Sequence, residues 1–371
     1  MAVVLFAEHL PYVKSTNLVV QIEAGLDSNT RLQITESGYS INLQHHGQEE
    51  RIRLYTPVSE QHDTKLLPSP PATSRTSRLV GLSRSRRSTA TSEQNKILWT
   101  ASQLGDSLRF SCGGKSASGD ECNSPLLDQQ TVKSCKDLPS EGWAEMMDLW
   151  HCHKPEEDHD HEQVNGKGYS ASSKLTAKSG IGYVDILTIL VSQEDCTNIT
   201  VSGTIGSVAC SKCGSPLGEV DSLCSGIRLF KPLLKRIKSE CDNTEEHYQV
   251  SKWLSSYLLA LIDTSGARKF QGRYNDFTIW IFSPLVYYSL STYTGQPEPA
   301  VKIFYKRHLI QPRAEATKLN SQNLSLDELT LPATLEAALV DELGRANSIL
   351  PNDARRFQDW NVALLNRFPV E

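Results

Sequence analysis

The sequence has no long apolar stretch and none of the short motifs that mark the common enzyme classes. Its early apolar run, Val3 to Phe6, is brief, lacks a basic flank and soon meets charged residues, so we expect neither a signal peptide nor a membrane span. We find no phosphate-binding glycine loop, no His-Glu-x-x-His and no Gly-x-Ser-x-Gly. Most common cofactor and hydrolase classes therefore lack support, and we expect a cytoplasmic and nuclear protein without a membrane partner.

The sequence also lacks a large excess of charge of one sign, because the 371 residues carry a net charge of only −5. This balance gives no reason to expect a nucleic-acid partner, and we expect no direct contact with nucleic acid. Nine cysteines are present, which is an odd number. Without a secretory leader they are interpreted as thiols and metal ligands and not as disulfides. The length leaves room for two or three domains.

What the chain does contain is a cysteine pair in Cys210-Ser-Lys-Cys213-Gly214. The Cys-x-x-Cys spacing lets both thiolates reach one ion, and the glycine lets the chain turn back with amide N–H groups facing the sulfurs. This pattern is typical of a zinc knuckle. The alternatives are free buried cysteines or a disulfide.

A second half-site lies far upstream. The segment Cys122-Asn-Ser-Pro-Leu126 repeats the pattern of Cys213-Gly-Ser-Pro-Leu217, and Cys112 is the available mate for Cys122. Their spacing is wider than in an ordinary knuckle and indicates a small-residue insertion at 113–121. A closed four-thiolate site leaves no position for a substrate, so the zinc should be structural. The predicted ligands are Cys112, Cys122, Cys210 and Cys213.

Alternation of apolar and polar residues predicts antiparallel strands in an N-terminal β region at 1–67. Residues 68–96 are rich in serine, proline and arginine, and their low apolar content predicts a disordered insertion. Arg84, Arg86 and Arg87 within it fit either a solvated loop or a nuclear-import or RNA-contact patch.

The remainder divides at about residue 241. Residues 97–241 hold the knuckles, a motif of Trp, Cys and His, and a polar loop at 156–180, which is either solvated or a weak metal binder. Residues 242–371 are predicted to be α+β. We predict a β-rich α+β fold of antiparallel sheets with a few helices, tied by the split four-cysteine zinc site.

Two helices and several strands are predicted in the last part of the chain. Helical periodicity covers 245–262, and an Ala/Leu/Glu helix covers 332–343 with Gly344 as its stop. The final segment at 360–367 fits a strand or a short helix. Strands are also predicted near 269–273, 277–282 and 300–306.

The motif between the two half-sites predicts a helix with an apolar stripe. Ser140 is a good N-cap, and Trp143, Met146, Met147 and Trp150 fall on one face, as core residues usually do. The helix should stop before Pro155, which places Cys152 at its end, between His151 and His153. Three interpretations of Cys152 stay open: a packed side chain, a ligand or partner contact, and a nucleophile activated by an imidazolium. The negative end of the helix dipole disfavours the last.

These residues together resemble the HECT-like E2-binding proteins, a family of ubiquitin-ligase-like proteins that bind ubiquitin-conjugating enzymes. The resemblance runs from about Leu18 to the C-terminus and excludes the two loop insertions. It rests on Asp137-Leu-Pro-Ser-Glu-Gly-Trp143, Trp150-His-Cys152-His153, Cys210-Ser-Lys-Cys213 with Leu217-Gly218-Glu219, and Leu350-Pro with Trp360-Asn-Val-Ala-Leu-Leu.

The resemblance implies that region 242–371 is HECT-like and E2-binding, and that the protein promotes ubiquitin transfer. It also implies a role in pre-mRNA 3′-end processing, through the cleavage and polyadenylation endonuclease. In that alternative the protein is a non-enzymatic inhibitor or chaperone that places Cys152 on the nuclease's catalytic zinc and displaces the attacking water. The partner-binding residues would be Trp143, Trp150, Cys152 and His153.

One departure from the HECT pattern concerns catalysis. A HECT ligase carries ubiquitin on a cysteine near its C-terminus, whereas no cysteine follows Cys241 here. Whether the protein is an E3 ubiquitin-protein transferase is therefore open, and Cys152 is the one candidate nucleophile. A third hypothesis is a zinc-stabilised scaffold with neither activity. We expect Cys135, Cys196, Cys224 and Cys241 only to pack.

Overall fold

The computed structural model describes two compact units, and each is presented by itself. Unit 1 combines residues 1–96 with 250–371, and unit 2 spans residues 97–249. None of the described helices is long and apolar enough to cross a membrane. The residues that the structure describes are 3–23, 25, 30–58, 74–80 (backbone only), 95–105, 108–116, 118–138, 175–203, 206–238, 244–293, 295–308 and 326–369.

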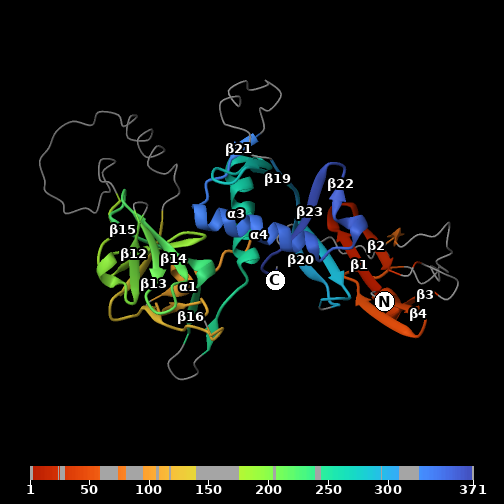
Figure 1. Cartoon of the computed structure of the whole chain (residues 1–371), viewed down its shortest axis with the longest axis horizontal. Coiled ribbons are helices and arrows are strands. Elements are labelled where there is room, and N and C mark those ends of the chain that lie inside the picture. Colours follow the sequence, from red (N-terminus) through yellow and green to blue (C-terminus); the bar gives the residue numbers. More distant parts are fainter. Residues whose placement is uncertain are drawn as a thin grey trace, which may run out of the picture. The chain divides into compact units, whose positions relative to one another are not determined.

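Unit 1 is built on a nine-stranded sheet and a three-stranded sheet, with two long helices (Figure 1). The path through the large sheet is β22-β23-β20-β19-β1-β2-β6, and β18 joins β19 to β21. Its strands are β1 (Val3–Leu10), β2 (Ser15–Ile22), β6 (Ser74–Val80), β18 (Lys269–Gln271), β19 (Phe277–Leu290), β20 (Glu298–Arg307), β21 (Leu326–Glu328), β22 (Arg356–Phe357) and β23 (Trp360–Asn366). The small sheet is β3 (Arg31–Thr35), β4 (Ser40–His45) and β5 (Gln48–Arg53). The helices are α3 (Val250–Ser265) and α4 (Ala333–Ser348), with short 3-10 turns η1 (Pro11–Val13), η2 (Glu36–Gly38) and η7 (Asn352–Ala354).

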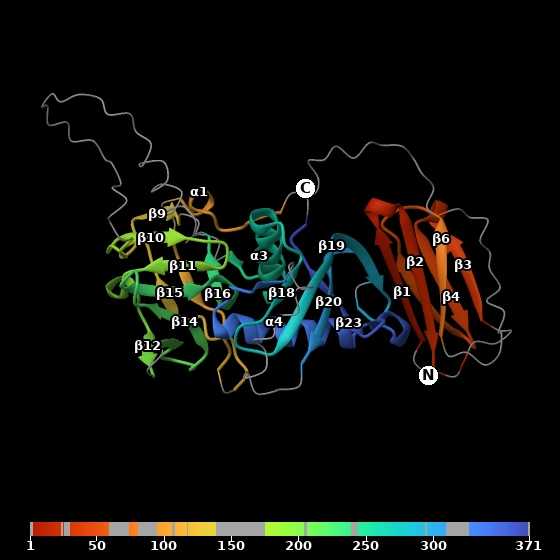
Figure 2. The same cartoon turned by 90° about the horizontal axis from the view of Figure 1, so that it is seen from above.

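Strands β1 and β2 supply two cores from their two faces, which explains the consecutive apolar residues at 3–7 in β1 and at 18–20 in β2. Leu5 and Val20 point into a core shared with the small sheet, where Ile41 and Ile52 are fully buried. Phe6 belongs to the core on the opposite face. Figure 2 shows β1 and β2 running side by side, as their antiparallel register requires.

Unit 2 contains a seven-stranded and a four-stranded sheet in its described part. The orders are β12-β13-β14-β15-β11-β10-β9 and β17-β16-β7-β8, and every pairing in them is antiparallel except β9 with β10. The strands are β7 (Phe110–Cys112), β8 (Pro125–Leu127), β9 (Ser134–Asp137), β10 (Ile181–Val184), β11 (Thr188–Val191), β12 (Ile199–Ser202), β13 (Ser207–Cys210), β14 (Pro216–Asp221), β15 (Gly226–Phe230), β16 (Leu234–Ile237) and β17 (Glu245–Glu246). Its helical turns are α1 (Ala101–Leu104), η4 (Gln193–Asp195) and η5 (Lys231–Leu233).

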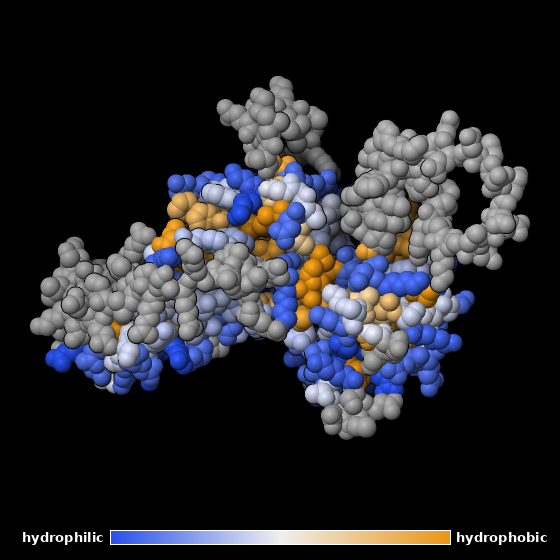
Figure 3. Space-filling view, turned by 180° about the vertical axis from the view of Figure 1, so that it is seen from behind, coloured by the Kyte–Doolittle hydropathy of each residue, from blue (hydrophilic) through white to orange (hydrophobic). Residues whose placement is uncertain are grey.

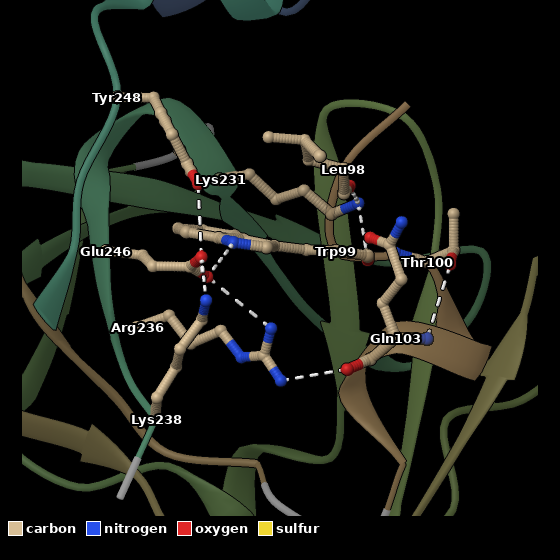
Figure 4. A network of polar contacts seen from close by, with 9 residues as sticks. All are labelled: Leu98, Trp99, Thr100, Gln103, Lys231, Arg236, Lys238, Glu246 and Tyr248. Carbon is tan, nitrogen blue, oxygen red and sulfur yellow. Dashed lines mark hydrogen bonds and ion pairs between the residues drawn. The ribbon is translucent and has the colours of Figure 1, made fainter. Parts of the chain in front are cut away.

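A buried lysine fastens the first residues of unit 2 (Figure 4). The Lys231 side chain is fully buried, and its ammonium donates to the carbonyl oxygens of Leu98 at 3.3 Å and Trp99 at 3.0 Å. Trp99 has a φ of +54°, a conformation that bulky residues rarely adopt. The two carbonyls that converge on Lys231 give a physical reason for this backbone geometry.

The Trp99 side chain is held from its other end by a carboxylate (Figure 4). Its indole N–H donates to Glu246 at 3.1 Å, so the segment entering unit 2 is joined to β17, which lies close to the end of the unit. Three further groups bind the same carboxylate: Arg236 at 3.5 Å, Lys238 at 2.6 Å and Tyr248 at 3.1 Å.

The predicted class is confirmed as a β-rich fold of antiparallel sheets with few helices. Helix α4 differs from its prediction because it continues through Gly344 to Ser348. Leu343 and Ala346 are buried on the same stripe as the preceding turns, so packing carries the helix past the glycine. The alternatives for the final segment are decided in favour of the strand β23.

Two further segments differ from the sequence interpretation. Glu245–Glu246 forms β17, and α3 begins only at Val250. Ser74–Val80, inside the segment predicted to be disordered, forms β6 and pairs with all but one residue of β2. Edge pairing needs backbone hydrogen bonds more than apolar side chains, so composition alone missed it. The rest of 68–94 lies outside the described residues.

Candidate metal centre

The two cysteine half-sites have matching backbone geometry. Gly214 follows Cys213 with a φ of +73°, and Asn123 follows Cys122 with a φ of +49°. Glycine and asparagine are the residues that best tolerate this left-handed conformation. The repeated pattern noted in the sequence therefore reflects the same turn at the same place.

Each half-site is the tip of a β-hairpin. Strands β13 and β14 pair in one hairpin, and β7 and β8 pair in the other. The amide of Cys210 donates to the carbonyl of Ser215 at 2.9 Å, and the amide of Cys112 donates to the carbonyl of Ser124 at 2.8 Å. Equivalent backbone hydrogen bonds therefore close the two hairpin tips. Each tip brings its two cysteine sulfurs to one side of the turn.

The nine-residue insertion in the first half-site folds back on itself. Lys115 and Glu121 form an antiparallel bridge, and the Ser116 amide donates to the Asp120 carbonyl at 2.8 Å. The Cys122 amide then donates to the carbonyl of Gly114 at 2.9 Å. The insertion closes as a small hairpin of its own, so the wide spacing still brings Cys122 back beside Gly114.

The four cysteines predicted as metal ligands come together in unit 2. Their sulfur atoms all lie within 4.8 Å of one another. The Cys112 and Cys213 sulfurs are 3.7 Å apart, as are those of Cys122 and Cys210. Four sulfurs at about 2.3 Å from a tetrahedral metal ion would be separated by about 3.8 Å. The cluster therefore has the donors and the spacing of a metal site such as a zinc site.

Local hydrogen-bond donors surround the sulfurs, as expected for a knuckle. The Gly114 amide donates to the Cys112 sulfur at 3.3 Å, and the Ser215 hydroxyl lies 3.2 Å from the Cys213 sulfur. Backbone hydrogen bonds from Ser124 and Ser215 also reach Cys122 and Cys213. These donors favour the thiolate forms that a metal ion requires.

Burial and hydrogen bonding shift the pKa values of Cys112, Cys122 and Cys213 in different directions. Burial raises the pKa of Cys112 and of Cys122 above the ordinary value. Burial would also raise the pKa of Cys213, but hydrogen bonds from Ser215 and from the neighbouring cysteines lower it to about 6. A metal ion would replace these separate titrations by binding all four as thiolates.

Sequence reasoning missed two supports of the cluster. Lys235 is buried on β16 and contacts Glu121 and, at 2.7 Å, the side-chain oxygen of Asn123, so it fastens the insertion to the sheet. The second support is Ser215, which contacts the Cys213 sulfur. The repeated Cys-x-Ser-Pro pattern, which places Ser124 and Ser215 at the same position, was the signal that could have revealed it. Lys235 had no such signal, because it lies more than one hundred residues after Glu121 in the chain.

The predicted partner-binding residues Trp143, Trp150, Cys152 and His153 lie outside the described residues. Their roles, including the nucleophile and the ligand of an endonuclease metal, stay predictions of the sequence. Cys241 also lies outside them. The seven cysteines in the described part of the chain, Cys135, Cys196 and Cys224 among them, form no disulfide.

Fold and cluster together define a class: a β-rich protein of two units, one of which carries a four-thiol cluster between two hairpins. The sequence profile of the HECT-like ubiquitin-conjugating enzyme (E2)-binding family matches residues 8–362. The chain belongs to this family.

Two fungal proteins are similar to the chain. The Saccharomyces cerevisiae protein named "Uncharacterized protein YJR141W" is 26% identical over 253 residues, which cover 65% of this chain and 66% of that protein. The Schizosaccharomyces pombe protein named "Uncharacterized protein C1734.10c" is 24% identical over 261 residues, covering 67% and 71%. The chain thus aligns with about two thirds of the length of these relatives. No solved structure matches it significantly.

Proposed function

We propose that the protein binds a ubiquitin-conjugating enzyme and promotes transfer of its ubiquitin, while a structural zinc ion holds unit 2 together. The observation that carries the proposal is the family match, which extends over residues 8–362 and so includes both units. Ubiquitin and the conjugating enzyme are the partners of this activity. We place it in the cytoplasm and nucleus, because the described cysteines form no disulfide with one another.

The zinc ion is proposed from the chemistry of its donors. Four cysteine sulfurs within 4.8 Å of one another form one of the usual structural zinc sets, and a closed set leaves no coordination position for a substrate. Such an ion contributes roughly 10–16 kcal/mol to folding at neutral pH. Its role is therefore to join the β7–β8 and β13–β14 hairpins, which are about one hundred residues apart in sequence.

Ubiquitin transfer is proposed to occur directly from the conjugating enzyme. Residues 242–371 contain no cysteine, so this region offers no thiol for a ubiquitin thioester. A protein that binds the loaded enzyme can still accelerate discharge by holding its thioester in a reactive conformation, because orientation alone lowers the barrier.

The test uses ubiquitin-loaded conjugating enzyme and free lysine as the acceptor. Wild-type protein, Cys152→Ala and the control Cys224→Ala are each added, and loss of the thioester is followed on non-reducing gels. We expect all three to accelerate discharge equally and to form no reducible ubiquitin adduct.

An adduct on wild type that is absent from Cys152→Ala would instead make Cys152 a nucleophile. No acceleration and no complex with any of a panel of conjugating enzymes would contradict the proposed function.

A further inference from the structure

The four cysteines of the metal centre differ in their access to solvent. Cys112, Cys122 and Cys210 are buried, with at most 5% of each residue exposed, whereas Cys213 is only partly buried. Cys213 lies at the tip of the β13–β14 hairpin, where its neighbours on both sides in the sequence are exposed. A small molecule that approaches the cluster from solvent therefore meets the Cys213 sulfur first.

The space beside this tip is open in the described part of the chain. A Cβ atom on Gly214, the residue after Cys213, would have no atom within 4 Å apart from those of its chain neighbours. Figure 3 shows, in blue, that hydrophilic residues make up much of the described surface on the side seen from behind. Hydrogen peroxide is small and polar, so neither the packing at the tip nor a surface of this kind keeps it from Cys213.

The sulfur contacts within the cluster run from one hairpin to the other. The Cys213 sulfur contacts those of Cys112 and Cys122, and these two also contact Cys210. The sulfurs of Cys112 and Cys213 lie 3.7 Å apart, as do those of Cys122 and Cys210. A disulfide bond is about 2.05 Å long, so each of these two pairs needs to close by only about 1.7 Å. The geometry therefore favours a disulfide between the hairpins over one within the Cys-x-x-Cys tip.

The chemistry that suits these sulfurs to a metal ion also makes them oxidisable, because the thiolate is both the metal ligand and the nucleophile that attacks a peroxide. Attack of the Cys213 thiolate on one oxygen of hydrogen peroxide gives a sulfenic acid and releases hydroxide. The Cys112 thiolate then attacks the Cys213 sulfur, which forms the disulfide and releases a second hydroxide. Two thiolates and one hydrogen peroxide thus become one disulfide and two hydroxide ions, and the peroxide takes up the two electrons that the sulfurs lose.

We propose that Cys213 is an oxidation site for hydrogen peroxide and other small hydroperoxides, and that its product is a Cys112–Cys213 disulfide that displaces the zinc ion. The inference rests on the zinc site of the proposed function and is independent of ubiquitin transfer. The disulfide removes two of the four ligands, and Cys122 and Cys210 alone do not complete a tetrahedral site. Because the same bond keeps the two hairpins covalently joined, reduction restores all four thiolates in place, and the oxidation is reversible.

The experiment uses the full-length Cys224→Ala variant, loaded with zinc and treated with hydrogen peroxide. Zinc release is followed with a chromophoric indicator, the remaining thiols are alkylated, and the protein is digested with trypsin without reduction. Trypsin places Cys112 alone in peptide 110–115, and in this variant it places Cys213 alone in peptide 213–228. We expect a cross-link between these two peptides that appears together with zinc release, and we expect dithiothreitol with added zinc to reverse both.

A second variant tests whether Cys213 is the sulfur that reacts first. Cys213→His keeps a zinc ligand, because Cys₃His is one of the usual structural zinc sets, but it removes the partly exposed sulfur. We expect its zinc release by peroxide to be at least about tenfold slower than that of wild type. Cys224→Ala, which also removes one thiol but lies outside the cluster, is the matched control and should release zinc at the wild-type rate.

Several results would overturn the proposal. A disulfide between Cys210 and Cys213 would do so, as would zinc release without any disulfide, or intact thiols and bound zinc under conditions that oxidise free cysteine. If Cys213→His does not hold zinc, the peptide map of Cys224→Ala still decides. If the purified protein contains no zinc, the zinc site of the proposed function fails, whereas the same map shows whether peroxide joins Cys213 to Cys112.

Discussion

At the scale of single residues, the metal centre depends on small side chains where two hairpin tips meet. A Cβ atom on Gly114 would lie 2.2 Å from the Ser215 hydroxyl oxygen, and one on Gly113 would lie 2.8 Å from the Leu233 carbonyl oxygen. Real Cβ atoms do not approach other atoms this closely. The Gly-Gly pair after Cys112 is therefore required by packing around the cluster.

The Gly114→Ala substitution should weaken metal binding. The added methyl group displaces Ser215, whose hydroxyl and amide contact the Cys213 sulfur. Loss of such a supporting contact typically costs 10- to 100-fold in metal affinity, on the order of 1.4–2.7 kcal/mol. Zinc affinity is measured by competition with a chromophoric chelator. Gly344→Ala, in the middle of α4, is the matched control and should leave zinc affinity unchanged.

The buried Lys231 should make stability depend on pH. Burial lowers its pKa to about 7, against the opposing influence of Asp185, Asp137 and Cys135. Between pH 7 and about 10 the unfolded chain therefore binds a proton that the folded chain does not, and this contribution to the free energy of unfolding rises with pH. Below pH 7 both states are protonated and the contribution is constant.

Lys231→Met removes this contribution, so the stability of wild type relative to the variant should increase between pH 7.5 and 9. The slope approaches about 1.4 kcal/mol per pH unit, the limit for one proton. Urea unfolding at a series of pH values measures it. A difference that does not change with pH would show that the folded lysine keeps an ordinary pKa.

At the scale of elements, the centre consists of two hairpins that carry the same turn. The hairpin formed by β13 and β14 has the short Cys-x-x-Cys tip, whereas the tip between β7 and β8 contains the inserted small hairpin. Because the insertion closes through Lys115 and Glu121, its outer residues do not contribute ligands to the cluster.

Replacing residues 116–120 by Asn-Gly should preserve metal binding. The two-residue turn joins Lys115 to Glu121 across their existing bridge, which is the geometry that Asn-Gly favours. We expect one zinc ion per chain by mass spectrometry and a change in unfolding free energy below about 1 kcal/mol. Loss of zinc in this variant would mean that the insertion itself positions Cys112 or Cys122.

At the scale of the whole molecule, both units bury apolar side chains, but the four predicted metal ligands all lie in unit 2. Unit 1 has two apolar cores on the faces of its sheets. A metal ion that binds only the folded state stabilises the unit that contains it. Metal removal should therefore affect the two units unequally.

Chelation should destabilise unit 2 selectively. Hydrogen exchange followed by mass spectrometry, with and without a strong zinc chelator, should show loss of protection in peptides from 108–127 and 206–238. Peptides from 277–307 in unit 1 should keep theirs. Equal loss in both units, or none in either, would contradict a structural metal confined to unit 2.

Local patterns in the sequence were sufficient for much of the fold. Period-two alternation predicted the strands β3, β4 and β5, because a strand with one buried face shows that pattern directly. Boundaries failed where packing decided, as in α4 beyond Gly344, and where backbone pairing alone made a strand, as in β6. The four cysteines could be grouped because their two segments repeat one motif.

The sequence by itself therefore determined the class of fold, the family and the identity of the four clustered thiols. Each of these follows from short sequence patterns, namely alternation within strands, local motifs and the repeated cysteine segments. Only the tertiary structure decided that the Cys112 and Cys213 sulfurs lie 3.7 Å apart, that Gly114 leaves space for Ser215, and that Lys235 contacts the insertion. These relations join residues up to about one hundred positions apart, and no local periodicity encodes them, because they arise from how the sheets and hairpins pack.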